Sequence, residues 1–158
     1  MKIIKVVILC VVALTATSVF AQEKTTDANM QILREKVKAD KKLVMAANMD
    51  LSEAEAKQFW PIYESYQKDL QVLDERLGKT ILAYADAYNK KSLTDAQAME
   101  LTNEVLAIDQ DEVALRKTYA AKLGRAIPAL KMARYLQIEN KIRAAIKYEL
   151  AAGIPLVP

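Results

Sequence analysis

Apolar residues recur every three or four positions along most of the chain, which is the spacing of one face of an α-helix. The longest series lies between residues 52 and 89, where steps of four and three alternate almost as in a heptad repeat. Its members are Phe59, Tyr63, Tyr66, Leu70, Leu73, Leu77, Ile81, Tyr84 and Tyr88. At 1.5 Å per residue this series predicts a helix of roughly 55 Å. Alternating β-branched runs are missing, so the predicted fold class is all-α.

Two capping boxes mark helix starts. Ser52 stands three positions before Glu55, and Thr94 stands three positions before Gln97. In such a box the hydroxyl accepts from the N3 backbone N–H, and the N3 side chain accepts from the N-cap N–H. The two boxes therefore predict that helices begin directly after residues 52 and 94.

The boxes and the apolar series together predict four helices. The first covers about residues 26–48, with one face marked by Met30, Leu33, Val37, Val44 and Ala47. The second covers residues 52–89, and the third follows the second box and ends near Gly124. Because only residues 89–92 separate the second and third helices, we expect a long antiparallel helical hairpin at the centre of an elongated or cradle-like bundle.

The third helix carries a charged residue on its apolar face. The face consists of Ala98, Leu101, Val105, Ile108, Leu115 and Tyr119. Glu112 interrupts it, so we expect the face to be open to water or paired at that level.

The fourth helix begins at Pro128 and stops at Gly153, which we place at the C′ position. Its predicted inward residues are Met132, Leu136, Ile142, Ile146 and Leu150. A polar cluster on the same helix is formed by Gln137, Glu139, Asn140 and Lys141. A solvated face is the favoured interpretation of this cluster, and an inter-helix hydrogen-bond network is the alternative.

Pro61 lies inside the second predicted helix. Proline removes one backbone hydrogen bond and disfavours helical geometry at the residue before it. Two outcomes stay open: a kink at Pro61, or a short first helix followed by a second that begins there.

Residues 1–21 have the pattern of a secretory signal peptide. Lys2 and Lys5 precede an apolar stretch at residues 6–16, and Val19-Phe20-Ala21 is a small-residue cleavage site. The apolar stretch is short of the roughly 20 residues that a membrane span needs. We predict cleavage after Ala21, an exported protein without a transmembrane segment, and a single all-helical domain over residues 22–158.

Composition excludes several classes of chemistry. The only cysteine, Cys10, lies in the signal peptide, and the chain has no histidine. Disulfides, thiolate chemistry, zinc sites and histidine-based triads are therefore excluded from the mature chain. We expect no enzyme, no metal and no cofactor. Export and a mature net charge of +1 make nucleic acid a poor partner.

Charge is distributed unevenly along the mature chain. Residues 92–115 carry six acidic and no basic side chains, whereas residues 116–158 carry nine basic and two acidic ones. The favoured interpretation is complementarity with helix dipoles and pairing within the molecule. The alternative is a cationic surface for a partner, with a basic rim that includes Arg134.

The capping boxes also carry a resemblance. Leu93-Thr94-Asp95-Ala96-Gln97 is a full LTxxQ motif, and Leu51-Ser52-Glu53-Ala54-Glu55 differs by Ser for Thr and Glu for Gln. Together with the signal peptide and the cysteine-free helical chain, these motifs make the sequence resemble the Spy/CpxP-like family of periplasmic helical proteins. The resemblance implies a curved, usually dimeric helical cradle that shields unfolded clients without ATP or reports envelope stress to a membrane sensor. The histidine- and methionine-rich flanks of some members are absent here, which argues against metal sensing.

We therefore predict a non-catalytic periplasmic binding protein, a homodimer, whose partners are unfolded or envelope proteins or a membrane sensor. The candidate protein-binding residues are Phe59, Trp60, Tyr63, Tyr66, Arg134, Ile154 and Leu156. For the three aromatics on the apolar series a core position is the favoured interpretation, and for Trp60 the two interpretations weigh equally. For residues 154–157 the favoured interpretation is that they fold back onto the bundle, and the alternative is a free docking peptide. The alternative function is a structural or assembly module that dimerises or docks on one envelope partner through the heptad face of residues 52–89.

Overall fold

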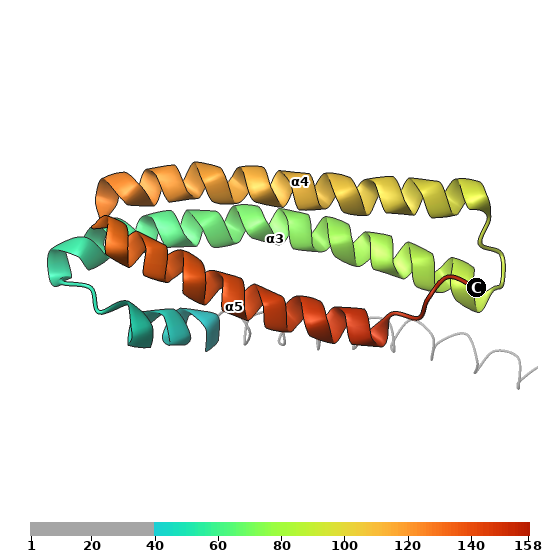
Figure 1. Ribbon diagram of the computed structural model, residues 1–158, viewed down its shortest axis with the longest axis horizontal. Coiled ribbons are helices and arrows are strands. Elements are labelled where there is room, and N and C mark those ends of the chain that lie inside the picture. Colours follow the sequence, from blue (N-terminus) through green and yellow to red (C-terminus); the bar gives the residue numbers. More distant parts are fainter. Residues whose placement is uncertain (1–39) are drawn as a thin grey trace, which may run out of the picture. The chain divides into compact units, whose positions relative to one another are not determined.

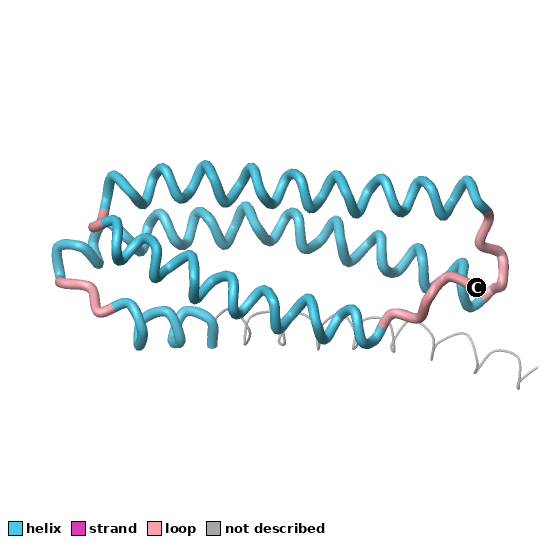
Figure 2. Tube along the Cα trace, in the orientation of Figure 1, coloured by secondary structure: helices cyan, strands magenta, loops and turns pink. Residues whose placement is uncertain are grey.

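The computed structural model describes residues 40–158, which are helical apart from short connections (Figures 1 and 2). The all-α prediction is confirmed. The chain divides into two units, Met1–Asn48 and Met49–Pro158. The signal peptide, the cleavage site after Ala21 and the predicted helix before residue 40 lie outside the described residues. The single domain over residues 22–158 stays a prediction.

Residues 40–49 are helical, but the predicted apolar face is wrong there. Val44 and Ala47 are exposed, whereas Met45 and Met49 are fully buried. Met45 and Met49 are four residues apart and so lie on one face of the helix. Met45 is one position after the predicted Val44, and Met49 is two positions after the predicted Ala47.

The second unit contains three long helices: α3 (Glu53–Asn89), α4 (Asp95–Ala126) and α5 (Ala129–Gly153). Helices α3 and α4 pack along each other as an antiparallel hairpin (Figure 1). Tyr66 contacts Tyr119, and Arg76, which comes later in α3, bonds Asp111, which comes earlier in α4. The two helices therefore run in opposite directions. The predicted hairpin is therefore confirmed. Helix α5 packs against α4 and reaches α3 through side chains.

Both capping boxes form. The Ser52 hydroxyl accepts from Glu55 N–H and the Thr94 hydroxyl accepts from Gln97 N–H, each at 3.3 Å. In return Glu55 and Gln97 accept from the two N-cap amides at 2.7 and 3.0 Å. Local sequence chemistry thus fixes where α3 and α4 begin.

Loss of either cap has a measurable cost. We expect Ser52→Ala and Thr94→Ala each to lower the free energy of unfolding by about 1 kcal/mol, because one N-cap hydrogen bond disappears. The sites start different helices, so the losses should add in the double variant. Urea unfolding followed by circular dichroism measures them, with Thr118→Ala as a mid-helix control expected to be near neutral. Coupling above about 0.5 kcal/mol between the caps would contradict independent helix starts.

Pro61 lies in the interior of a continuous α3. Of the two outcomes left open by the sequence, the one in which a second helix begins at Pro61 is wrong, because helical structure starts at the Ser52 cap and continues through the proline. Phe59 and Tyr63, on either side of it, are buried. Packing of these two rings holds the backbone helical where local preference opposes it.

Removing the proline should stabilise α3. We expect Pro61→Ala to raise the free energy of unfolding by about 1–3 kcal/mol, because alanine restores an N–H donor and removes a clash in the preceding turn. Pro61 is exposed, so little packing is lost. The control Lys68→Ala, at an exposed α3 position, should stay within about 0.5 kcal/mol of the parent. Unchanged or lower stability of Pro61→Ala in urea unfolding would refute this interpretation.

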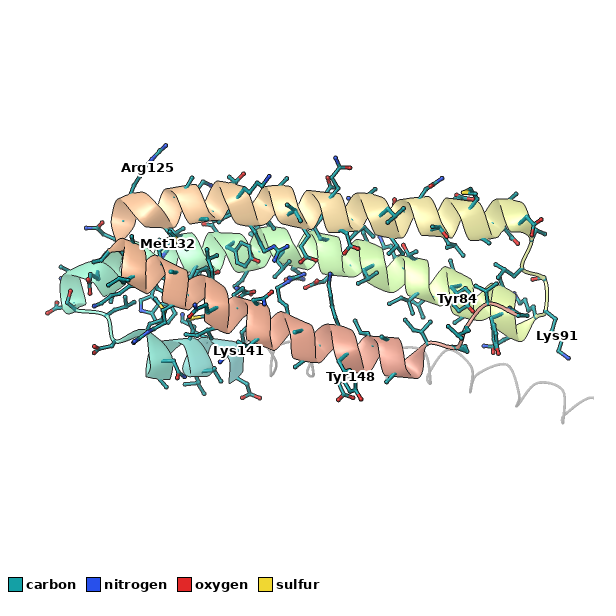
Figure 3. All side chains as sticks on the ribbon, in the orientation of Figure 1. Tyr84, Lys91, Arg125, Met132, Lys141 and Tyr148 are labelled. Carbon is teal, nitrogen blue, oxygen red and sulfur yellow. The ribbon has the colours of Figure 1, made fainter. Side chains whose placement is uncertain are left out.

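Helix α5 differs most from expectation. Its buried residues are Tyr135, Glu139 and Arg143, not the predicted aliphatic series. Met132, Leu136 and Ile142 are half-buried, and Ile146 and Leu150 are exposed. From residue 144 onward every position of α5 is exposed, and Tyr148 points away from α3 and α4 (Figure 3). The inward face is set by polar partners on α3 and α4, which the apolar periodicity of α5 does not reveal.

Two predicted boundaries shift slightly. Helix α4 ends at Ala126 rather than near Gly124, and Pro128 is the N-cap of α5 rather than its first residue. Gly153 is the last residue of α5, has no positive φ and is followed by the extended C-cap Ile154, so its placement at C′ is wrong.

Candidate functional site

The aromatic residues predicted from α3 form a buried cluster. Phe59, Tyr63 and Tyr66 are each at most 3% exposed. The ring of Tyr135 on α5 lies 5.5 Å from Phe59 and 6.3 Å from both Tyr63 and Tyr66, in edge-to-face arrangements. Tyr66 also contacts Tyr119 on α4 at 5.4 Å. The cluster therefore joins all three helices, and the core interpretation of the three α3 rings is confirmed.

The other candidate residues near this end are more accessible. Trp60 is half-buried, with its ring edge-on to Phe59 at 5.0 Å and to Tyr63 at 5.4 Å. Arg134 is exposed on α5. A role of either residue in binding stays a prediction.

A polar layer lies beside the aromatic cluster. Glu139 on α5 is 1% exposed and accepts a hydrogen bond from Gln67 on α3 at 3.5 Å. Burial raises the pKa values of Tyr63, Tyr66 and Tyr135 well above the usual range, and the negative charge of Glu139 raises them further. For the predicted polar cluster both interpretations hold in part: Glu139 joins an inter-helix network, whereas Gln137, Asn140 and Lys141 are solvated.

Glu112 is the centre of a second polar group. It forms an ion pair with Arg143 of α5, and the two side chains are only 7% and 10% exposed. Lys147 of α5 lies 3.3 Å from the same carboxylate, and Arg116 lies 3.9 Å from it. Glu112, which interrupts the apolar face of α4, is therefore paired with cations and is not open to water. This pairing attaches α5 to α4.

Pairing within the molecule accounts for much of the acidic stretch of α4. Arg76 on α3 bonds Glu104 at 3.0 Å and Asp111 at 2.7 Å, and Lys147 bonds Asp109 at 3.0 Å. At the start of α3, Lys131 of α5 donates to Glu55 at 2.6 Å. This bond, followed by the one from the Ser52 amide, holds the pKa of Glu55 below its usual value. The first LTxxQ-type box is thus also an attachment point for α5.

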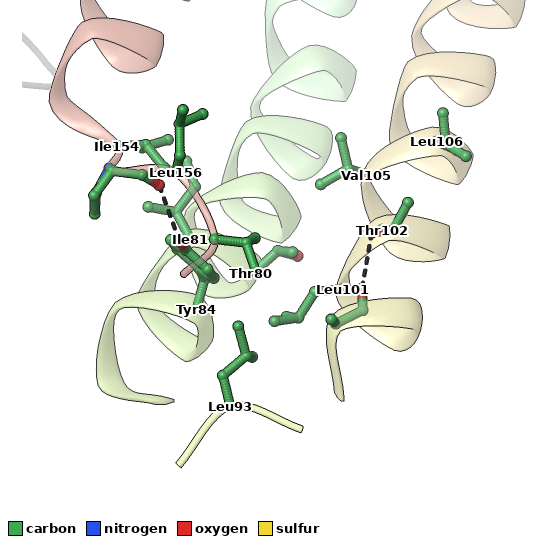
Figure 4. Close-up of a pocket in the computed structure, with 13 residues that line it drawn as sticks. Thr80, Ile81, Tyr84, Leu93, Leu101, Thr102, Val105, Leu106, Ile154 and Leu156 are labelled. Carbon is green, nitrogen blue, oxygen red and sulfur yellow. Dashed lines mark hydrogen bonds between the residues drawn. The ribbon is translucent and has the colours of Figure 1, made fainter. Parts of the chain in front are cut away.

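An apolar groove opens where α3 and α4 meet their connecting loop (Figure 4). Its volume is about 360 Å³. The hairpin wall consists of Thr80, Ile81 and Tyr84 from α3, Leu93 from the loop, and Ala98, Leu101, Thr102, Val105 and Leu106 from α4. Residues Ile154, Pro155, Leu156 and Val157, which follow α5, form the other wall. Two sequence candidates, Ile154 and Leu156, therefore lie at this groove.

The groove presents apolar side chains to water. Leu106 is 60% exposed at its rim, and Leu156 is 90% exposed on the opposite wall. No charged side chain lines it. The Thr80 and Thr102 hydroxyls donate to carbonyls of their own helices, at 3.0 and 2.8 Å. An apolar concave surface with exposed aliphatic rims is typical of a site that binds another apolar segment.

Sequence reasoning missed the hairpin side of the groove. Leu106 directly follows Val105, which belongs to the apolar face of α4. The pair 105–106 therefore extends this apolar face toward solvent. Leu93 precedes the Thr94 cap, where a leucine braces the chain entry against Ala98, and this role does not mark it as a groove residue. Two adjacent apolar residues at positions 105 and 106 are therefore the sequence signal for the hairpin side of the groove.

Comparison of the chain with protein-family models, curated proteins and solved structures gives no match. Within residues 40–158 no helix is long and apolar enough to cross a bilayer. The same residues contain no group of three or more His, Cys, Asp or Glu side chains arranged to hold a metal ion. The described part of the molecule is an all-α protein built on a capped antiparallel hairpin, with a paired polar interior and an apolar groove.

Proposed function

We propose that the protein is a non-catalytic periplasmic binding protein, of the Spy/CpxP-like kind, that holds apolar segments of unfolded or envelope proteins. The apolar hairpin wall of the groove, formed by α3, α4 and their loop, carries this proposal. The wall is aliphatic, leaves Leu106 in water at its rim, and already holds an apolar segment of the chain itself, residues 154–157.

Three other features support the proposal. Both LTxxQ-type boxes, on which the resemblance rests, form helix caps. The signal-peptide pattern of residues 1–21 is the basis for export and for the periplasmic location. The absence of cysteine and histidine from the mature sequence favours binding over catalysis. Dimerisation, and a membrane sensor as partner, belong to the same proposal and rest on the resemblance.

Suppression of aggregation tests the proposal. The purified protein, without nucleotide and at a near-stoichiometric ratio, should slow light scattering of a reduced or denatured client. Leu106→Asp should lose at least about half of this effect, because a carboxylate at the rim opposes burial of an apolar segment. Leu130→Asp is the matched control, since Leu130 is 87% exposed and lies outside the groove.

Two results would overturn the proposal. The first is no effect of the unmodified protein on several unrelated clients. The second is equal loss of activity in the Leu106 and Leu130 variants. Co-purification with a single envelope partner, together with no effect on unfolded clients, would instead favour the structural or assembly module.

A further inference from the structure

The residues that follow α5 already occupy one side of the groove. Helix α5 ends at Gly153, and Ile154 continues in an extended conformation, with φ −98° and ψ 117°. The Tyr84 hydroxyl donates to the Pro155 carbonyl at 2.9 Å (Figure 4). Residues 154–158, the post-α5 segment, carry no charged side chain, and residues 154–157 place aliphatic side chains against the hairpin wall.

This segment is held weakly. Ile154 is half-buried, whereas Leu156 and Val157 are 90% and 61% exposed. The bond from Tyr84 is the one side-chain hydrogen bond to the segment among the described residues. Exposed aliphatic residues gain little from this position, so the segment is easily displaced.

The residues of the hairpin wall determine which kind of ligand the groove can bind. The Thr80 and Thr102 hydroxyls are bonded within their own helices, so Tyr84 supplies the lining hydroxyl that reaches across the groove. Without a charged lining residue the groove has no counter-ion for an ionised ligand. The ligand that fits is aliphatic and uncharged, and it carries a carbonyl oxygen to accept from Tyr84. An extended peptide such as Ile-Pro-Leu-Val has these properties.

We propose that the groove binds extended, uncharged aliphatic peptide segments, and that the post-α5 segment is a built-in competitor for the same site. The inference rests on the proposed function, because such segments are what an unfolded client exposes. A competitor that is seated nine-tenths of the time lowers the apparent affinity for a free peptide about tenfold.

The test uses a fluorescent synthetic peptide with the sequence of residues 150–158, followed by fluorescence anisotropy. The peptide should bind a variant that lacks residues 154–158 about tenfold more tightly than it binds the intact protein. The deletion removes no helical residue, and unchanged circular dichroism verifies the fold. The intact double variant Ile154→Asp, Leu156→Asp should also gain affinity, because a charged segment no longer competes for the groove.

Two substitutions in the deletion variant locate the peptide. Tyr84→Phe should weaken binding about two- to tenfold, which is the effect of one lost hydrogen bond. Leu106→Asp should abolish it, while the control Leu130→Asp should leave it unchanged. A peptide with Asp in place of Leu156 should not bind any form of the protein.

Several outcomes would overturn the inference. If the peptide binds no form of the protein, or binds the intact and truncated proteins with equal affinity, the post-α5 segment does not compete for the groove. Binding of dodecanoate rather than the peptide at the same residues would assign the groove to acyl chains. If the protein suppresses aggregation, and Leu106→Asp impairs this suppression, but the peptide does not bind, the inference fails and the proposed function stands. If the protein neither suppresses aggregation nor binds the peptide, the inference and the proposed function both fail.

Discussion

Replacement of Glu112 by leucine should lower the free energy of unfolding by about 3–5 kcal/mol. The substitution leaves Arg143, whose side chain is 10% exposed, without its carboxylate partner inside the molecule. Lys147 and Arg116 are more accessible and can turn toward water, so Arg143 accounts for most of the loss. Urea unfolding followed by circular dichroism measures the effect.

A double variant separates pairing from packing. Glu112→Leu combined with Arg143→Met should recover most of the lost stability, because apolar residues of similar volume often replace a buried ion pair at little cost. Replacement of the more exposed cation Arg76 by methionine is the control, with an expected loss of about 1 kcal/mol or less. Near-neutral behaviour of the single Glu112 variant would contradict the buried pairing that attaches α5 to α4.

Replacement of Tyr135 by alanine should have an effect of similar size, about 3–5 kcal/mol. The ring is 1% exposed and contacts Phe59, Tyr63 and Tyr66, so truncation leaves a cavity at the junction of α3 and α5. The matched control is Tyr135→Phe, which keeps the ring. The Tyr135 hydroxyl has Gln67 as its one polar neighbour and makes no well-formed hydrogen bond, so its loss should change the free energy of unfolding by about 1 kcal/mol or less.

The same unfolding assay decides this prediction. A loss below about 1 kcal/mol for the alanine variant would mean that α5 is not held by the aromatic cluster. A large loss for the phenylalanine variant would mean that the hydroxyl, rather than the ring, makes the essential contact.

The hairpin was predictable from sequence because its determinants are local. The Ser52 and Thr94 boxes act within one helical turn, and the aromatic series of α3 has one strong period. The proline was harder to interpret. Its local preference suggested a break, but burial of Phe59 and Tyr63 on either side keeps α3 continuous through Pro61.

The inward face of α5 was not predictable in the same way. Glu139 and Arg143 face the interior because their partners, Gln67 and Glu112, approach from other helices. Such pairs are remote in sequence and leave no periodic signal on α5 itself. Apolar spacing alone therefore predicts Ile146 and Leu150 as inward residues, and both are exposed.

The candidate site was predicted only in part. Ile154 and Leu156 line the groove, but the hairpin residues opposite them were not recognised. The groove arises because the chain turns back after α5 and meets the loop end of α3 and α4. The favoured interpretation that residues 154–157 fold back onto the bundle is confirmed. The surface that they meet was not predictable, because the Tyr84 bond to Pro155 joins residues far apart in the sequence.

Hydrogen exchange of the protein with and without an unfolded client tests the central claim most directly, because it locates the binding surface without any substitution. We predict that the client slows exchange of backbone amides around the groove, at residues 80–84 and 98–106, and leaves α5 near Tyr135 unchanged. Protection confined to other regions, or no change at residues 80–84 and 98–106 while the client is bound, would contradict the account.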